Sequence, residues 1–392
     1  MLSRPMIDRV AFLGISWYSI IIVSSLLIGI VISRREAVRY GFSPDVIIDY
    51  TLWAIPLGIL FARIYYVFFR FNIYSDNLLR FFDIREGGLA IYGGILGGML
   101  AARIVSKRRK IEIGRLLDSL APSLVLGQAL GRWGNYINME AFGLRVNEAE
   151  LQFFPLAVEI PVGNIWYWQL ATFFYEFCYD IAVFFILWFA IRPNKKKTGD
   201  IFLWYILLYC SGRTVIEGLR SDSLTFISDF VRISQVLSAL ASLVIVVIFF
   251  YRIRDSISIV TILPLIGSIL AITETFLGEF ERNAYSDLFV ISQAGLLVLF
   301  LSLLITLIIW TLDCGHFDIK CFLMLVPDMI FYLFLFVYGL GRINEDNTYY
   351  VTFRQIASML QVILSGYLLC YRFFPGALRE KGPQIKRFVI HG

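Results

Sequence analysis

Four polar side chains interrupt an apolar run in the segment GRWGNYINMEAFG, residues 131–143. Arg132, Asn135, Asn138 and Glu140 fall within nine positions of the chain. Guanidinium forks bind phosphates and carboxylates, and asparagine amides bond to hydroxyls or ester carbonyls. A carboxylate beside them can accept a proton. The segment therefore predicts a site for an anionic or polar ligand at the end of a hydrophobic helix.

A second group of charged residues lies in SGRTVIEGLR, residues 211–220, and it contains Arg213, Glu217 and Arg220. Arg213 and Glu217 are four positions apart, which also fits a plain ion pair on one helix. In the same way, asparagines such as those of the first segment often cap a helix end and reverse the chain. These structural alternatives explain each residue singly and stay open at this point.

The composition places these groups in a membrane protein. The chain of 392 residues is 58% hydrophobic and 16% aromatic, and only 17% of it is charged. Its mean hydropathy of +0.73 lies well outside the range of soluble domains. The net charge of +5 comes from basic clusters between apolar runs, as in cytoplasmic loops, so nucleic acid is not an expected partner. The five cysteines have no framework spacing and are expected to behave as small hydrophobic residues.

About 20 apolar residues cross a bilayer as a helix, and eleven runs come close to this length. We expect membrane helices near residues 14–33, 47–69, 88–105, 116–137, 167–191, 200–217, 231–251, 257–276, 288–312, 321–341 and 354–371. The first is expected to be retained, because no small-residue cleavage site follows it. The predicted fold class is therefore an all-α polytopic membrane protein.

Basic clusters in short loops give the expected orientation. They lie at 34–39, 107–110, 192–197 and 252–254, in alternate loops, and the positive-inside rule makes those loops cytoplasmic. The N-terminus is then outside and the C-terminus is inside. Residues 70–86 are expected to form an outer amphipathic segment on the membrane surface.

With this orientation, the polar exceptions gather near the outer interface. They are Tyr18, Tyr92, Arg132, Asn135, Asn138, Glu140, Arg213, Glu217 and Arg220. Charged groups at membrane depth are costly and usually face a cavity or one another, so we expect one site there. Its natural ligand is a phospholipid headgroup.

The residue inventory limits the chemistry of this site. The only histidines, His316 and His391, fall on the cytoplasmic side, which excludes a Ser-His-Asp or Cys-His device at the outer cluster. No His, Cys and carboxylate set with metal-ligand spacing lies near it. We therefore expect no metal and no cofactor.

The glycine-rich stretch GGLAIYGGILGG, residues 87–98, pairs Gly93 with Gly97 and Gly94 with Gly98. Small residues four apart let membrane helices approach closely. We expect these glycines to serve mainly in helix packing.

Several stretches together resemble one known family. GRWGNYINMEAFG closely resembles the signature of the bacterial prolipoprotein diacylglyceryl transferases. SWYSI, GGLAIYGGILGG and the run from GDIFLWYILLYCSGRTVIEGLRSDSL to VRISQVLS agree with that family in order, over roughly residues 10–253. The resemblance implies a seven-span inner-membrane enzyme with its active site on the outer face.

The resemblance also implies an activity and its partners. Such an enzyme moves the diacylglyceryl group of phosphatidylglycerol to the lipobox cysteine thiol of a prolipoprotein, forms a thioether and releases glycerol phosphate. We assign catalysis to Arg132, Glu140, Arg213 and Glu217, and substrate binding to Tyr18, Arg63, Tyr92, Asn135, Asn138, Gly143, Glu176 and Arg220. Arg63, Gly143 and Glu176 rest on the resemblance alone. Some relatives have a histidine at the position of Tyr92, so the obvious general base is absent from this chain.

The implied reaction needs a thiolate and a stabilised leaving phosphate. Arg132 and Arg213 on the phosphodiester would spread the charge on the departing oxygen, and an arginine-rich cavity would lower the thiol pKa. Glu140 or Glu217 could accept the proton or hold the arginines in place. Tyr92 is assigned to positioning, because a tyrosine base would need a pKa far below its usual value of about 10.

Residues 257–392 lie beyond the usual end of the family and add four expected helices. We therefore divide the chain into a transferase-like core, residues 1–256, and an additional membrane region of unknown role. Within that region, FYLFLFVYGLGRINE (331–345) is similar to LWYILLYCSGRTVIE, and RQIASMLQVILS (354–365) is similar to VRISQVLS. A partial duplication and a chance likeness of leucine-rich helices both stay open.

Two other classes of protein compete with the transferase. A transporter or flippase of an anionic lipid would also use intramembrane charges and broken helices, but its polar groups should continue to the cytoplasmic side. A catalytically inactive lipid-binding scaffold would fit if the Tyr92 change abolishes chemistry. The transferase is the favoured reading. It is expected in the bacterial cytoplasmic membrane near the outer leaflet, with phosphatidylglycerol and a prolipoprotein signal peptide as partners.

Overall fold

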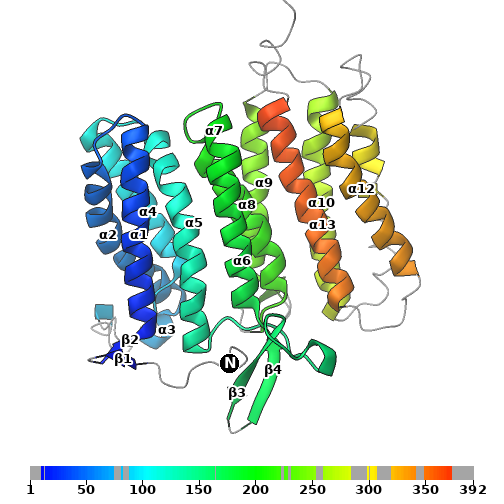
Figure 1. The fold of residues 1–392 in the computed structure, drawn as a ribbon, viewed down its shortest axis with the longest axis horizontal. Coiled ribbons are helices and arrows are strands. Elements are labelled where there is room, and N and C mark those ends of the chain that lie inside the picture. Colours follow the sequence, from blue (N-terminus) through cyan, green and yellow to red (C-terminus); the bar gives the residue numbers. More distant parts are fainter. Residues whose placement is uncertain are drawn as a thin grey trace, which may run out of the picture. The chain divides into compact units, whose positions relative to one another are not determined.

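Long helices dominate the computed structural model, which describes residues 10–12, 14–74, 81–82, 88–163, 165–221, 225–227, 231–252, 259–283, 298–299, 301–306, 319–340 and 348–372. The helices are α1 (Trp17–Arg39), α2 (Asp45–Phe69), α4 (Ile91–Arg109), α5 (Ile113–Asn138), α6 (Thr172–Phe185), α8 (Asp200–Gly218), α9 (Ile233–Tyr251), α10 (Ile259–Asn283), α12 (Ile319–Leu340) and α13 (Thr348–Tyr367) (Figure 1). Shorter segments are α3 (Phe71–Tyr74), η3 (Ala149–Leu151), η4 (Ile186–Ile191), α7 (Arg192–Asn194) and η7 (Leu368–Arg372). Among the described residues, five helices are long and apolar enough to cross a membrane. The predicted class, a helical multi-pass membrane protein, is confirmed.

Contacts divide the chain into two compact units. The first unit holds residues 6–138 and 177–205, and the second unit holds residues 1–5, 139–176 and 206–392. The division into a transferase-like core, residues 1–256, and an additional region, residues 257–392, rests on the sequence resemblance and stays a prediction.

The predicted spans overlap the observed helices, with one local exception. A helix was expected over 167–191, but residues Ile165–Leu170 form strand β4 and the helix begins only at Thr172. The run IWYWQL is apolar enough to count as part of a span, yet its aromatic and β-branched residues favour a strand. Of the expected span 288–312, only residues 298–299 and 301–306 belong to the described part of the chain.

Short antiparallel strands complete the described structure. β3 (Ala157–Val162) pairs with β4 in a hairpin whose register runs from Ala157↔Leu170 to Val162↔Ile165. β1 (Val10–Phe12) pairs with β2 (Ile15–Ser16), and β5 (Thr225–Ile227) pairs with β6 (Val231–Arg232). These hairpins were not predicted from the sequence, because none is long enough to stand out from the apolar runs that surround it.

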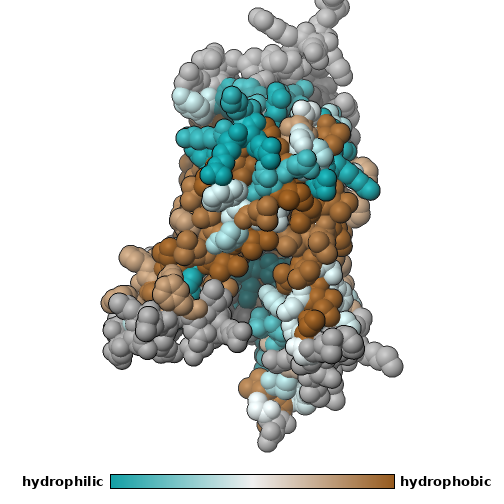
Figure 2. All heavy atoms as spheres, turned by 90° about the vertical axis from the view of Figure 1, so that its left-hand side faces the viewer, coloured by the Kyte–Doolittle hydropathy of each residue, from teal (hydrophilic) through white to brown (hydrophobic). Residues whose placement is uncertain are grey.

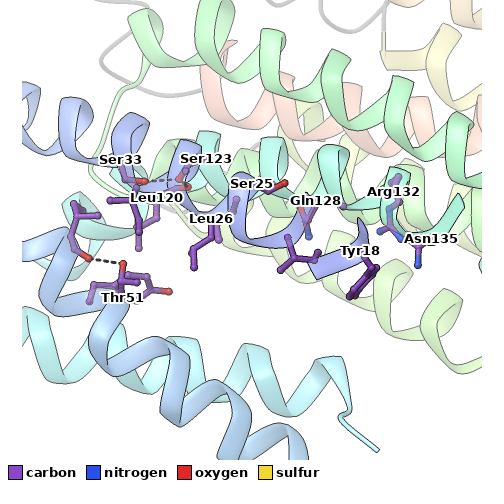
Figure 3. Close-up of a pocket in the computed structure, with 18 residues that line it drawn as sticks. Tyr18, Ser25, Leu26, Ser33, Thr51, Leu120, Ser123, Gln128, Arg132 and Asn135 are labelled. Atoms are coloured by element: carbon purple, nitrogen blue, oxygen red, sulfur yellow. Dashed lines mark hydrogen bonds between the residues drawn. The ribbon is translucent and has the colours of Figure 1, made fainter. Parts of the chain in front are cut away.

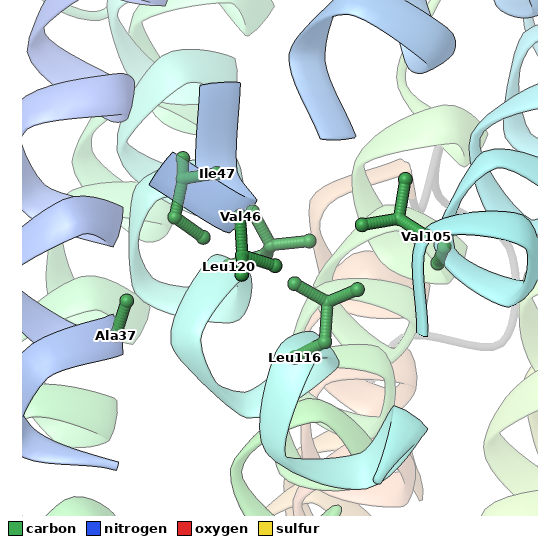
Figure 4. Packing of buried hydrophobic residues seen from close by; sticks show 7 residues of the cluster. Ala37, Val46, Ile47, Val105, Leu116 and Leu120 are labelled. Carbon is green, nitrogen blue, oxygen red and sulfur yellow. The ribbon is translucent and has the colours of Figure 1, made fainter. Parts of the chain in front are cut away.

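An apolar cluster joins four helices of the first unit. It consists of Ala37 of α1, Val46 and Ile47 of α2, Ala102 and Val105 of α4, and Leu116 and Leu120 of α5 (Figure 4). Around α1, α2 and α4, Figure 2 shows a band of apolar side chains below a hydrophilic end. Large apolar side chains such as Leu27, Leu52 and Ile95 are exposed there, as expected where a helix faces lipid.

Two buried carboxylates tie the helices of the first unit together near its basic loops. Glu36 of α1 accepts hydrogen bonds from Arg192, whose Nε lies 3.0 Å from Glu36 Oε2. Asp118 of α5 accepts the backbone N–H groups of Gly199 and Phe202, at 2.9 Å and 3.0 Å. A carboxylate at a helix N-terminus satisfies donors that the helix leaves unpaired. Asp118 therefore fixes the start of α8 against α5.

The glycines of α4 divide into two kinds. A Cβ on Gly93 would lie 2.6 Å from Ala62 Cα, and one on Gly97 would lie 2.8 Å from Gly58 Cα, both in α2. A Cβ on Gly94 or Gly98 would meet nothing closer than 3.6 Å. The predicted close packing is thus confirmed for Gly93 and Gly97, whereas the other pair has room.

The second unit contains two helix pairs with the same polar contact. The Gln235 Nε2 of α9 donates to the Thr214 carbonyl of α8 at 3.1 Å. The Gln355 Nε2 of α13 donates to the Thr275 carbonyl of α10, also at 3.1 Å. The sequence likeness of α13 to α9 thus extends to this contact, but the helix that takes the place of α8 is α10 rather than α12. Arg342 and Glu345, which carried part of the likeness, lie outside the described residues.

We expect Gly97→Ala to lower the free energy of unfolding by about 1–3 kcal/mol, because its methyl group would overpack the α2 backbone. Gly98→Ala, one position further along the same helix, should be neutral or stabilise by up to about 1 kcal/mol, since alanine is the better helix former. Equilibrium unfolding in mixed detergent micelles measures both. Equal destabilisation by the two changes would contradict the assigned packing.

Candidate active site

A cavity of about 490 Å³ runs between α1, α2 and α5 in the first unit (Figure 3). Tyr18, Arg132 and Asn135 lie at one end, and Ser33, Ser123 and Thr51 lie toward the other. Apolar side chains from α1 and α5 line the stretch between them, including Ile22, Leu26 and Leu124. A cavity with a cationic end and an apolar wall suits an amphiphile whose headgroup is anionic.

The cationic end is built by two helices. Arg132 and Asn135 are three positions apart on α5, so both face the cavity. Tyr18 comes from the first turn of α1, where the Ser16 hydroxyl caps the helix by accepting the Ser19 N–H at 3.1 Å. The Tyr18 ring lies so close to α5 that a Cβ on Gly134 would be 2.7 Å from its Cδ2. Gly134, the second glycine of GRWGN, therefore lets Tyr18 reach the end of the cavity where Arg132 lies.

Polar groups continue along the cavity away from Arg132. The Ser33 and Ser123 hydroxyls are 2.5 Å apart, and the Tyr205 hydroxyl donates to Gln128 Oε1 at 3.0 Å. The Thr51 hydroxyl bonds back to the Ile47 carbonyl at 2.8 Å. Most of these groups bond to one another or to backbone, so they hold the helices together without adding charge. The net charge of the cavity lining comes from Arg132.

The second group of predicted residues forms an ion network in the second unit. Arg213 of α8 pairs with Glu176 of α6 and, at 2.5 Å, with Glu217 one turn along α8. Arg220 Nη1 lies 3.8 Å from the same Glu217 oxygen. The two glutamates are almost fully buried, at 4% and 3% exposure, while Arg213 keeps 15%. Two arginines and two glutamates leave this network neutral, with Arg213 as its centre.

Gln235 belongs beside this network, although the sequence reasoning missed it. It is fully buried, and its bond to the Thr214 carbonyl holds α9 against α8 one residue from Arg213. A glutamine in the apolar run ISQVLSALASL was the available signal, since a polar amide inside a membrane helix needs a partner.

Gly143 and Arg220 lie next to each other through the backbone. They form an isolated antiparallel bridge, and the adjoining Leu144 N–H donates to the Leu219 carbonyl at 2.8 Å. A Cβ on Gly143 would lie 2.5 Å from Leu170 Cβ and 2.9 Å from the Leu219 oxygen. Gly143 thus permits a close backbone approach that joins the end of α8 to the β3–β4 hairpin.

Glu140 lies between two residues with unusual backbone geometry. Met139 and Ala141 have φ angles of 57° and 60°, a left-handed conformation that is uncommon outside glycine and asparagine and is enriched at functional sites. The Ala141 carbonyl accepts the buried Thr172 hydroxyl at 2.7 Å, which supports this turn. Glu140 itself is exposed.

Three predicted residues have other surroundings. Arg63 is buried at 2% exposure, its Nε donates to the Phe81 carbonyl at 2.8 Å, and its Nη1 donates to the Gly88 carbonyl at 3.2 Å. It therefore holds the segment that leads into α4. Tyr92 lies against Tyr65, with ring centroids 6.1 Å apart, and does not line the cavity. Asn138 is the last residue of α5.

The family is decided by comparison with known proteins. A family model described as prolipoprotein diacylglyceryl transferase matches residues 5–251. The chain belongs to this family. The match includes the cavity and the Arg213 network, and it ends at the last residue of α9.

Similar proteins have the same family name. A phosphatidylglycerol-prolipoprotein diacylglyceryl transferase of Oceanobacillus iheyensis is 39% identical over 257 residues, which cover 63% of this chain and 88% of that protein. A transferase of this name from Enterococcus faecalis is 40% identical over 257 residues, covering 64% and 92%. One from Listeria innocua is 38% identical over 252 residues, covering 63% and 89%.

We expect Arg213→Met to lower the free energy of unfolding by about 3–5 kcal/mol, because the buried Glu176 loses its cation and Glu217 keeps only Arg220, at 3.8 Å. Adding Glu176→Gln should restore most of that loss, since Glu217 then keeps Arg220 as its cation and no uncompensated charge remains. Arg145→Met is the control, because Arg145 is exposed and stacks over Tyr167 in the same unit. A double variant as unstable as Arg213→Met would contradict the assigned network, and equilibrium unfolding in detergent decides between the two.

Proposed function

We propose that this protein transfers the diacylglyceryl group from phosphatidylglycerol to the lipobox cysteine thiol of prolipoproteins. The observation that carries the proposal is the cavity within residues 5–251, the part of the chain that the family model matches. This cavity combines a guanidinium at one end with an apolar wall. The names of the similar proteins state the same lipid and the same protein substrate. In the reaction, sulfur forms a bond to a glycerol carbon, the carbon–oxygen bond to phosphate breaks, and glycerol phosphate leaves.

In this proposal the first unit binds the lipid. Arg132 takes the phosphodiester, and Asn135 and Tyr18 bond to its oxygens or to the glycerol hydroxyls. An acyl chain then lies along the wall formed by Ile22, Leu26 and Leu124. Arg63 and Tyr92 affect the substrate indirectly in this proposal. Arg63 holds the carbonyls of Phe81 and Gly88, and Tyr92 packs against Tyr65 of α2.

The Arg213 network has a different task. A guanidinium has five N–H donors, and Glu176 and Glu217 hold the Arg213 fork in one orientation, with donors left for a developing phosphate charge. Glu217 is therefore assigned to hold the arginines rather than to accept the proton. The exposed Glu140 is the carboxylate assigned as proton acceptor for the thiol. Asn138, Gly143 and Arg220 position the backbone on either side of Glu140.

The proposed location is the bacterial cytoplasmic membrane, with the N-terminus outside, the C-terminus in the cytoplasm and the site near the outer leaflet. The last turns of α1 and α4 are basic, with Arg39 in one and 107–109 in the other. By the positive-inside rule this end of the first unit faces the cytoplasm. Tyr18, at the opposite end of α1, then lies on the outer side.

The direct test uses purified full-length protein in detergent with phosphatidylglycerol and a synthetic lipobox peptide. Mass spectrometry should find a diacylglyceryl adduct on the peptide cysteine. We expect Arg132→Ala and Arg213→Ala each to lower the rate by at least about 100-fold, the usual loss when a group that stabilises transition-state charge is removed. A well-folded protein that gives no adduct with any lipid or peptide tried would favour a flippase or an inactive scaffold instead.

Gly127 offers a test of lipid binding alone. It lines the cavity, and a Cβ added there would meet no atom within 4 Å. Gly127→Leu should therefore fill the acyl region while leaving the helix intact, because leucine favours helix over glycine by about 0.8 kcal/mol. We expect the KM for phosphatidylglycerol to rise about tenfold or more with little change in kcat. Gly127→Ala, which adds only one methyl group, should keep the original KM. An unchanged KM in Gly127→Leu would contradict the proposal that the lipid binds in this cavity.

A further inference from the structure

Six buried polar side chains lie on three helices that follow residue 251, where the family match ends. They are Glu274 of α10, Asp328 and Tyr332 of α12, and Arg354, Ser358 and Gln361 of α13, none more than 6% exposed. Glu274 and Arg354 bond directly, with Arg354 Nε 3.1 Å from Glu274 Oε1. Tyr332 lies beside the Ser358 hydroxyl and within electrostatic range of Asp328 and Glu274. We call this set the C-terminal polar cluster.

The members of this cluster lie at matching heights. The end of α12 and the start of α13 are joined by only seven residues, 341–347, and lie on the same side of the second unit. At a rise of 1.5 Å per residue, Asp328 lies about 18 Å from that side and Gln361 about 20 Å. Tyr332 and Ser358 lie at about 12 Å and 15 Å in the same measure. The cluster therefore occupies the middle of the helices, far from either end.

The charges of the C-terminal polar cluster do not balance. Glu274 and Arg354 cancel each other, and Asp328 adds one further carboxylate. Within the described part of the chain, neither oxygen of Asp328 has a hydrogen-bond partner. An uncompensated ion at membrane depth costs several kcal/mol, so a cation or a proton must accompany Asp328. Pro327, directly before it in α12, also frees a backbone carbonyl one turn earlier.

The surrounding atoms are oxygens that still have bonding capacity. Among the residues that the structure describes, Gln361 Oε1 also has no hydrogen-bond partner, and the neighbouring Tyr332 and Ser358 hydroxyls keep lone pairs beyond the contact between them. The Gln361 amide nitrogen donates to Ser302 Oγ at 3.2 Å. The amide oxygen is therefore the atom of this side chain that can bind a ligand. Carboxylate, hydroxyl and amide oxygens are the ligands of hard cations. A proton on Asp328 would satisfy only one of these oxygens.

We propose that the C-terminal polar cluster binds a monovalent cation, with sodium as the fitting size and charge. The cluster carries one excess negative charge, which a monovalent ion cancels and a divalent ion would reverse. The cluster has no histidine or cysteine, and no group of three His, Cys, Asp or Glu placed to hold a metal is found among the described residues, so its donors do not suit a transition metal. Asp328 supplies the charge, and Tyr332, Ser358 and Gln361 supply neutral oxygens from two helices. The ion thereby joins α12 to α13.

The test measures thermal unfolding of the full-length protein in detergent, with sodium exchanged for N-methylglucamine at constant chloride and ionic strength. Because an ion that binds only the folded state stabilises it, the unfolding midpoint should rise by about 2 °C or more as sodium increases. Asp328→Asn keeps the shape of the side chain but removes its charge, and it should abolish this dependence. Tyr332→Phe, which removes one oxygen, should shift the half-maximal sodium concentration upward and provides the test if Asp328→Asn does not fold.

Glu148→Gln is the matched control, because Glu148 is an exposed carboxylate of the same unit and its loss should leave the sodium dependence unchanged. Equal midpoints of the original protein in sodium and N-methylglucamine would overturn the proposal. A midpoint that depends on pH but not on sodium, and loses that dependence in Asp328→Asn, would assign a proton to Asp328 and also overturn it. The readout is stability rather than transfer, so it does not depend on the proposed enzymatic function.

Discussion

The interaction on which the second unit depends is the one between Arg213 and its two glutamates. In a helix bundle surrounded by lipid, a guanidinium cannot be stabilised by water, so it must be matched by carboxylates from the protein itself. Glu176 comes from α6 and Glu217 from α8, so the arginine joins two long helices that follow each other along the chain. Gln235 adds α9 through the Thr214 carbonyl. The position of three helices thus follows from one buried charge.

The same constraint explains which parts of the site could be predicted from the sequence. In an apolar chain, charged and amide side chains are visible as exceptions, and Tyr18, Arg132 and Asn135 indeed line one cavity. Arg213, Glu217 and Arg220 likewise form one network. The exceptions are few because each costs free energy in a membrane, and that scarcity makes the sequence informative.

Other parts could not be predicted, for equally physical reasons. Arg63 has the residue type of a ligand-binding group, and sequence spacing gives no sign that it bonds to the carbonyls of Phe81 and Gly88. The β3–β4 hairpin was hidden because β4, with five apolar or aromatic residues out of six, runs directly into the apolar helix α6. Gly93 and Gly94 are neighbours of the same residue type. They differ only in where a Cβ would lie: against the α2 backbone for Gly93, and in open space for Gly94.

Charge balance also separates the two polar regions of the second unit. The Arg213 network has two cations and two anions, so its charges balance within the chain. The C-terminal polar cluster has one cation and two anions, and this imbalance is the ground for the cation proposed there. The two helix pairs have the same glutamine-to-threonine contact, yet they differ in this balance. The same helix contact therefore occurs beside one set of charges that balances and one that does not, so the packing of the helices does not determine the charge that they enclose.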